Sequence, residues 1–165
     1  MRKSAQAEDS GPDNLIRWCV VASRVNAVIY RHHRDEPLQF LERLSNPSGR
    51  LLESELSAER PGTTSASARG SEIRHSVGGE QVQHERVASQ FARRIARVLE
   101  KAAQENRFGR LVLIAEPHFL GQLKHELSAS VRHRIEHELA KEFHQGSDRD
   151  LLEFIQKNLF PLKAA

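Results

Sequence analysis

The first third of the chain contains short apolar runs separated by polar breaks, a pattern typical of β-strands. Residues 15–22 are mostly apolar, and residues 25–30 are rich in β-branched and aromatic side chains. A third run, residues 38–44, ends at the turn pair Asn46-Pro47. Because only two residues separate the first two runs, the pattern predicts a hairpin that continues into a three-stranded antiparallel meander.

The middle of the chain changes to the spacing of an amphipathic helix. Apolar side chains recur every three or four residues over 84–106, and basic residues occupy the outer face. The continuous apolar run 111–115 fits a central strand that is covered on both sides. Glu116-Pro117 then begins another helix, because proline is common in the first helical turn.

Residues 131–143 decide the predicted topology. Their apolar residues are four apart, which suits one face of a helix and also one face of a strand. A final amphipathic helix begins near Ser147, an N-cap residue, and stops near Pro161. With 131–143 as a strand, the meander is followed by helix, strand, helix, strand and helix. We therefore predict an α/β fold with a ribonuclease-H-like mixed sheet.

Two segments carry too few apolar residues to join a core. Residues 1–13 predict a disordered tail, and residues 57–83, rich in Ser, Gly, Thr, Arg and Glu, predict a long flexible loop. We expect one domain over residues 14–162. Cys19 lies in an apolar run and predicts a buried, reduced thiol. Since no secretory signal or membrane-spanning run is present, we expect a cytoplasmic protein without membrane insertion.

The charge is unevenly distributed. The formal net charge is +3, too small a surplus to identify a nucleic-acid-binding protein. Residues 84–110, however, contain seven Arg and Lys against three Glu, a local surplus of +4. Arginine suits phosphate oxygens, so RNA or the ribosome is one predicted partner of this face. A solvated, solubilising face is the interpretation we favour, since aromatic stacking partners are scarce.

The common catalytic signatures are incomplete. The His-Glu pairs at His84, His125 and His137 lack the second His that a zinc-protease motif places one helical turn later. A two-metal nuclease needs carboxylates on the first strand, the long helix and the fourth strand. Glu85 and Glu116 fit the last two places, but the first strand contains no acid. We therefore predict no catalytic residue, no metal ion and no cofactor.

Several short motifs follow one another in a recognisable order. After an early Trp-Val-Val-type strand, the chain contains Asn46-Pro47 with Gly49-Arg50, Glu59-Arg60-Pro61-Gly62, His84-Glu85, Phe91-Ala92, and Glu116-Pro117-x-Phe119-Leu120-Gly121. Over about residues 15–143 this order resembles the bacterial host-attachment protein family, which is similar in turn to the central domain of archaeal and eukaryotic peptide-chain release factors. The resemblance implies a ribonuclease-H-like fold and the strand interpretation of 131–143.

The release-factor resemblance also draws attention to one tetrapeptide. In those factors a Gly-Gly-Gln loop before the long helix promotes peptidyl-tRNA hydrolysis. This chain has Gly78-Gly79-Glu80-Gln81 just before its own predicted helix. The inserted Glu80 would displace the Gln amide and add negative charge, so we do not transfer hydrolysis to this chain.

We predict a noncatalytic binding or regulatory protein whose link to host-cell attachment is indirect, because a cytoplasmic protein does not touch a host surface. The loop 57–83 and the helix after it would contact an unknown protein partner. One alternative is a ribosome- or RNA-associated factor. A second is a hydrolase of phosphodiester or peptidyl-tRNA bonds that uses Glu85, Glu116 and Gln81. The candidate binding residues are Arg60, Arg69, Arg74, His84, Glu85, Arg86, Arg93, Arg94 and Glu116.

Overall fold

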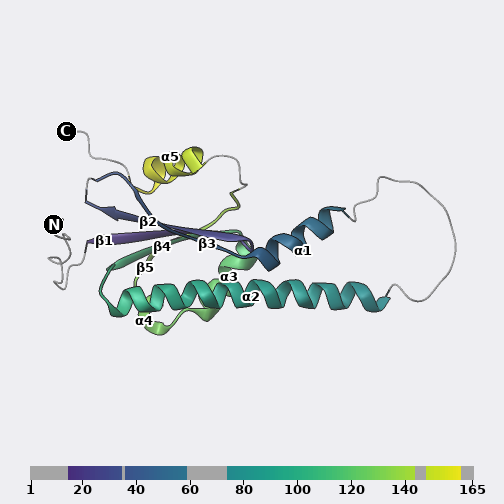
Figure 1. The fold of residues 1–165 in the computed structure, drawn as a ribbon. Coiled ribbons are helices and arrows are strands. Elements are labelled where there is room, and N and C mark those ends of the chain that lie inside the picture. Colours follow the sequence, from purple (N-terminus) through teal and green to yellow (C-terminus); the bar gives the residue numbers. More distant parts are fainter. Residues whose placement is uncertain (1–14, 35, 59–73, 144–147, 161–165) are drawn as a thin grey trace, which may run out of the picture.

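The computed structural model describes residues 15–34, 36–58, 74–143 and 148–160. Within these residues a five-stranded mixed sheet carries helices on both faces (Figure 1). The strands are β1 (Ile16–Ala22), β2 (Asn26–His33), β3 (Gln39–Ser45), β4 (Arg110–Ala115) and β5 (Ile135–Ala140). The helices are α1 (Pro47–Ala58), α2 (Arg74–Gln104), α3 (Pro117–Glu126), α4 (Ala129–Arg132) and α5 (Asp148–Asn158).

The strand order confirms the predicted fold class. Across the sheet the order is β3-β2-β1-β4-β5. Strand β2 is antiparallel to β1 and β3, whereas β4 is parallel to β1 and β5. The meander thus occupies one half of the sheet, and two strands that follow helices complete the other half. This is the topology of a ribonuclease-H-like fold.

Side chains along β1 point alternately to the two faces of the sheet, and each face has its own hydrophobic core. Trp18 and Val20 pack in the cluster that includes α2, α3 and α4, while Cys19 and Val21 pack in the cluster that includes α5. Helices α2 and α5 accordingly lie on opposite sides of the sheet in Figure 1. The predicted burial of Cys19 is confirmed, since its side chain is fully inaccessible.

Two predictions on the segment between β3 and the long helix are wrong. Pro47 does not close a turn but begins α1, a helix that was not predicted from the sequence. Helix α2 begins at Arg74 rather than near His84, so residues 74–83 are helical and not part of a loop. Residues 78–83 are all exposed, so their sequence shows no apolar stripe. Two predicted segments lie outside the described residues: the tail at residues 1–13 and the rest of the loop at residues 59–73.

The strand predicted over 131–143 is confirmed in its central part only. Val131 belongs to the short helix α4, where Ser128 is the N-cap and accepts a hydrogen bond from the Val131 amide. The strand itself runs from Ile135 to Ala140. Helix α5 agrees with the predicted final helix, although the expected N-cap Ser147 lies outside the described residues. No described helix combines the length and apolarity that crossing a bilayer requires.

Candidate functional site

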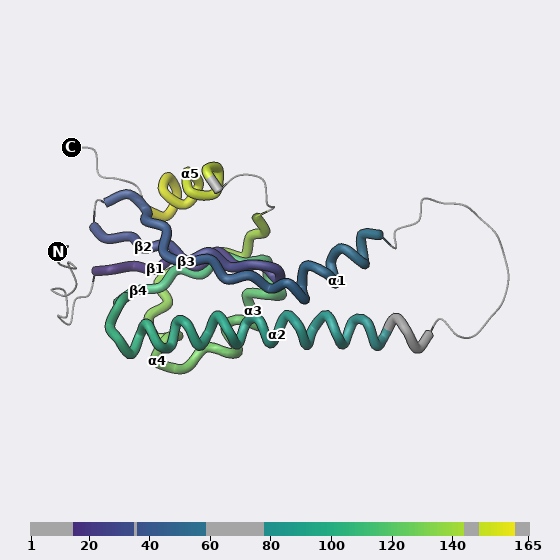
Figure 2. Tube along the Cα trace, viewed as in Figure 1, coloured from purple at the N-terminus to yellow at the C-terminus, as the bar shows by residue number. Residues whose placement is uncertain are grey.

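Helix α1 and the N-terminal part of α2 project beyond the sheet (Figure 2). We call α1 together with residues 78–87 of α2 the helical arm. Between its two helices lies a groove of about 340 Å³. The groove is lined by Ser48, Leu51, Leu52, Glu55, Leu56, Glu80, Gln83, His84 and Val87. The structure therefore places the candidate residue His84 in this groove, beside apolar side chains of α1.

Helix α1 is fixed to the sheet at its first turn. The Asn46 side-chain amide donates a hydrogen bond to the Arg24 carbonyl oxygen at 2.7 Å, and the Asn46 backbone N–H donates to the Val25 carbonyl oxygen at 2.8 Å. Gly49 packs directly against this junction, because a Cβ atom there would lie 2.6 Å from the Arg24 oxygen and 2.6 Å from Asn46 Nδ2. The residue at position 49 must therefore be glycine for α1 to approach so closely.

A larger cleft, of about 620 Å³, lies at the carboxyl ends of β1, β4 and β5. Ligand sites in open α/β sheets often occupy this end of parallel strands. The lining combines the turn after β1, the first residue after β4, the segment after β5 and one face of α1: Ala22, Ser23, Arg24, Val25, Arg50, Glu53, Ser54, Ser57, Glu116, Glu142 and Phe143. Helix α1 thus separates the cleft from the groove of the helical arm.

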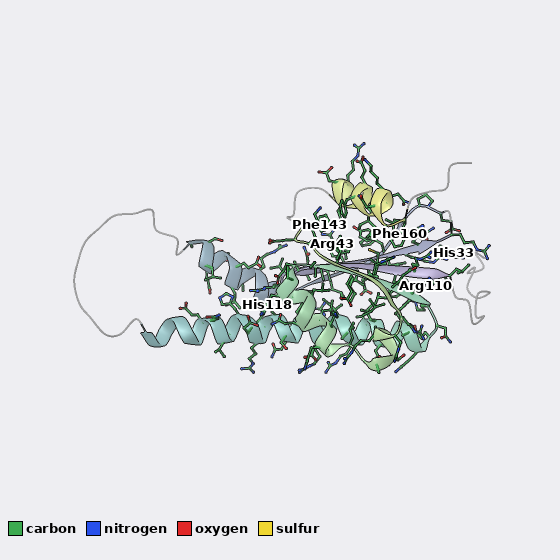
Figure 3. All side chains as sticks on the ribbon, turned by 180° about the vertical axis from the view of Figure 1, so that it is seen from behind. His33, Arg43, Arg110, His118, Phe143 and Phe160 are labelled. Atoms are coloured by element: carbon green, nitrogen blue, oxygen red, sulfur yellow. The ribbon has the colours of Figure 1, made fainter. Side chains whose placement is uncertain are left out.

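A polar network connects the cleft to α2. Glu116 caps α3 by accepting hydrogen bonds from the backbone amides of His118 at 3.1 Å and Phe119 at 2.7 Å. Its carboxylate also lies 3.5 Å from Arg24 Nε. The Arg24 guanidinium approaches His118 Nδ1 at 3.4 Å, and His118 Nε2 lies 3.5 Å from Glu85. Figure 3 shows His118 beside α2. Glu85 and Glu116 therefore belong to one network, linked through Arg24 and His118.

Each carboxylate of this network already has its own partners. Glu85 accepts a 2.6 Å hydrogen bond from Gln122 Nε2, and Glu116 is held by the α3 amides and Arg24. Among the described residues no three His, Cys, Asp or Glu side chains are grouped as metal ligands would be. His118 and Gln122 were not predicted from the sequence. Their separation of four residues places them on the same side of α3, and this spacing is the only signal of the pair in the sequence of the helix.

The candidate arginines of α2 differ in what they contact. Arg93 Nε lies 3.0 Å from Glu126, and this hydrogen bond raises the pKa of Arg93 and lowers the pKa of Glu126. Arg94 donates to the Ser45 carbonyl oxygen at 2.8 Å and lies over the Phe91 ring. Arg86 is exposed and makes no ion pair with another described residue. The three predicted arginines are therefore not equivalent.

Three further candidate residues lie wholly or partly outside the described residues. Arg60 and Arg69 lie outside the described residues, and of Arg74 only the backbone, the first residue of α2, is described. Gly78-Gly79-Glu80-Gln81 lies within α2 rather than in a loop before it. A Cβ atom added at Gly78 or Gly79 would meet nothing within 4 Å.

Comparison with known proteins identifies the family. Residues 18–155 match the family described as "Protein required for attachment to host cells". The chain belongs to this host-attachment family. No curated protein matches. Among solved structures, an archaeal translation termination factor is similar at 13% identity and a TM-score of 0.39, over 81% of this chain and 32% of that chain. The host-attachment family member therefore spans about a third of the length of the termination factor.

The matched residues of this host-attachment family member contain both candidate regions. Residues 18–155 include the whole of α1, α2 and α3 and the strand ends that border the cleft. The helical arm and the polar network are therefore parts of the family domain itself.

Proposed function

We propose that this host-attachment family protein is a noncatalytic binding protein that contacts a protein partner through the helical arm. The observation that carries the proposal is the incomplete packing of α1. Of its 12 residues only Gly49 is buried. Leu51 is 64% exposed and Leu56 50% exposed, although α2 lies beside α1.

The exposed apolar side chains are concentrated on the arm. In the described part of the chain five large apolar residues are exposed, and three of them, Leu51, Leu56 and Val82, belong to the arm. Single exposed apolar residues need no explanation, but Leu51 and Leu56 line the same groove, and apolar side chains rimmed by polar groups are typical of a protein interface. Glu55, Glu80 and His84 supply such a rim around the groove.

The polar network supports a structural role for the two candidate carboxylates. Glu116 is engaged as the cap of α3 and by Arg24, and Glu85 binds Gln122. A general base or metal ligand needs a carboxylate that is open to a substrate or ion, so this arrangement gives the hydrolase alternative little support. We keep the cytoplasm as the proposed compartment, and host-cell attachment is then an indirect result of partner binding.

Site-specific photo-cross-linking tests the proposal. A photoreactive phenylalanine derivative replaces Leu51 or Leu56 in the groove of the arm, and Phe40 on β3 serves as the control because it is similarly exposed, at 59%. The full-length variants are irradiated in lysate of the source organism, and the adducts are identified by mass spectrometry. We expect the same partner protein at positions 51 and 56 and its absence at position 40. Equal adducts at all three positions, or none on the arm, would contradict the proposal.

A further inference from the structure

One face of α2 carries a continuous row of basic and amide side chains. Positions 86, 90, 93, 97, 101 and 104 succeed one another by three or four residues and therefore lie along one line on the helix. Four of them are cations, Arg86, Arg93, Arg97 and Lys101, which we call the cationic row. The other two are Gln90 and Gln104. All six side chains are exposed, and none is a carboxylate.

Most of the positive charge in the cationic row is not neutralised by any residue that the structure describes. Arg93 pairs with Glu126, but Arg86, Arg97 and Lys101 form no ion pair with any residue the structure describes. The carboxylate of Glu100, beside the row, is instead bound by Ser128 and Gln104. Pairing among the described residues therefore leaves three cations available to an external anion.

The spacing of these cations works against the isolated helix. Arg93 and Arg97 are four residues apart, and so are Arg97 and Lys101. Like charges at this separation destabilise a helix by about 0.2–0.5 kcal/mol per pair. A bound polyanion removes this repulsion, so the arrangement favours a ligand with several negative charges over a single ion.

The length and chemistry of the row match a nucleic-acid backbone. Fifteen residues separate Arg86 from Lys101, which corresponds to about 22 Å along the helix axis. The packed part of α2 holds this line straight, since Ala92, Ile95 and Leu99 on its other side are fully buried. Arginine and glutamine both donate hydrogen bonds to phosphate and sugar oxygens.

We propose that the cationic row binds the phosphate backbone of a nucleic acid without reading its bases. The only exposed large aromatic side chain in the described part of the chain is Phe40, on β3 and away from the row, so base stacking does not contribute. Arg93, Arg97 and Lys101 lie on the packed part of α2 outside the helical arm, and only Arg86 belongs to both surfaces. The inference therefore does not depend on which partner binds the arm.

Fluorescence anisotropy with a labelled single-stranded RNA of about 20 nucleotides tests the inference. Three phosphate contacts, one for each cation without an ion pair, predict a slope of about −2.1 for log affinity against log salt concentration, which is an affinity loss of about 20-fold between roughly 50 and 200 mM salt. Undetectable binding of the full-length protein at the lower salt concentration would overturn the inference. Equal binding of polyglutamate would also overturn it, because any acidic polymer would then suffice.

Charge-reversal variants locate the binding surface. The row variant combines Arg86→Glu, Arg97→Glu and Lys101→Glu and leaves the Arg93–Glu126 pair intact. The control combines Arg34→Glu, Arg149→Glu and Lys157→Glu, which are exposed after β2 and on α5 and change the net charge equally. We expect the row variant to lose more than about tenfold in affinity and most of its salt dependence, while the control retains both. Equal weakening in the two variants would show that net charge alone is responsible.

Discussion

Replacing Gly49 by alanine tests the junction that fixes α1 to the sheet. In an exposed helix this substitution stabilises by about 1 kcal/mol, because alanine loses less backbone entropy. At position 49 the new Cβ atom would lie 2.6 Å from the Arg24 carbonyl oxygen, well inside contact distance. The Arg24 backbone cannot retreat easily, since the Ser23 N–H donates to the Asn26 carbonyl oxygen at 2.8 Å and closes this turn.

The expected magnitude follows from three contributions. Overpacking of this kind costs about 1–3 kcal/mol. Displacement of the Asn46 side chain from the Arg24 carbonyl oxygen costs about 1 kcal/mol more. The gain in helix propensity offsets about 1 kcal/mol. We therefore expect Gly49→Ala to destabilise the docked position of α1 by about 1–3 kcal/mol, opposite in sign to an ordinary helical substitution.

Urea unfolding combined with amide hydrogen exchange of α1 measures the effect. Gly121→Ala in α3 is the matched control, because a Cβ atom there meets nothing within 4 Å. We expect the control to stabilise the protein by up to about 1 kcal/mol, and Gly49→Ala to accelerate exchange in α1 and lower the unfolding midpoint. If both variants stabilise the protein alike, the close approach at Gly49 is not a constraint and the reasoning fails.

Three further outcomes are expected. Glu116→Ala removes the N-cap of α3 and should lower the free energy of unfolding by about 1 kcal/mol, measured by urea denaturation; an unchanged midpoint would contradict the capping role. Burial raises the pKa of the Cys19 thiol, so a thiol reagent should label it only at the rate of unfolding, and rapid labelling of native protein would refute this. Burial alone would raise the pKa of Glu136, but hydrogen bonds from Arg17 and Arg110 outweigh it and hold the pKa below its ordinary 4.5. The stability that these two hydrogen bonds contribute is complete above pH 4.5 and is lost as the pH falls through the lowered pKa of Glu136. Glu136→Gln should therefore flatten the pH dependence of the free energy of unfolding in acid.

The elements that border the core could be predicted because burial leaves a pattern in the sequence. Strand β4 is buried in five of its six residues and appears as one continuous apolar run. The packed part of α2 appears as an apolar stripe for the same reason. Residues 131–143 were ambiguous because a four-residue spacing fits two structures, and the family resemblance settled the choice correctly for Ile135–Ala140.

The missed elements are those that face little or no core. Helix α1 buries only Gly49, and residues 78–83 of α2 are exposed on all sides, so neither shows the apolar stripe from which a helix is predicted. The contacts of Glu85 with Gln122 and His118 join α2 to α3 and depend on how these helices pack. Sequence spacing within one helix contains no information about such a pairing.

The two proposed surfaces share α2 and meet at Arg86, but they can be tested separately through residues that belong to only one of them. His84 in the groove of the arm and Lys101 in the cationic row are 17 residues apart, about 25 Å along the axis. Substitutions at this distance without shared partners are expected to act additively. A change at Lys101 should therefore leave cross-linking at positions 51 and 56 unaltered, and a change at His84 should leave the salt dependence of RNA binding unaltered. Loss of both properties in one single-site variant would point to unfolding of α2 rather than to either binding surface.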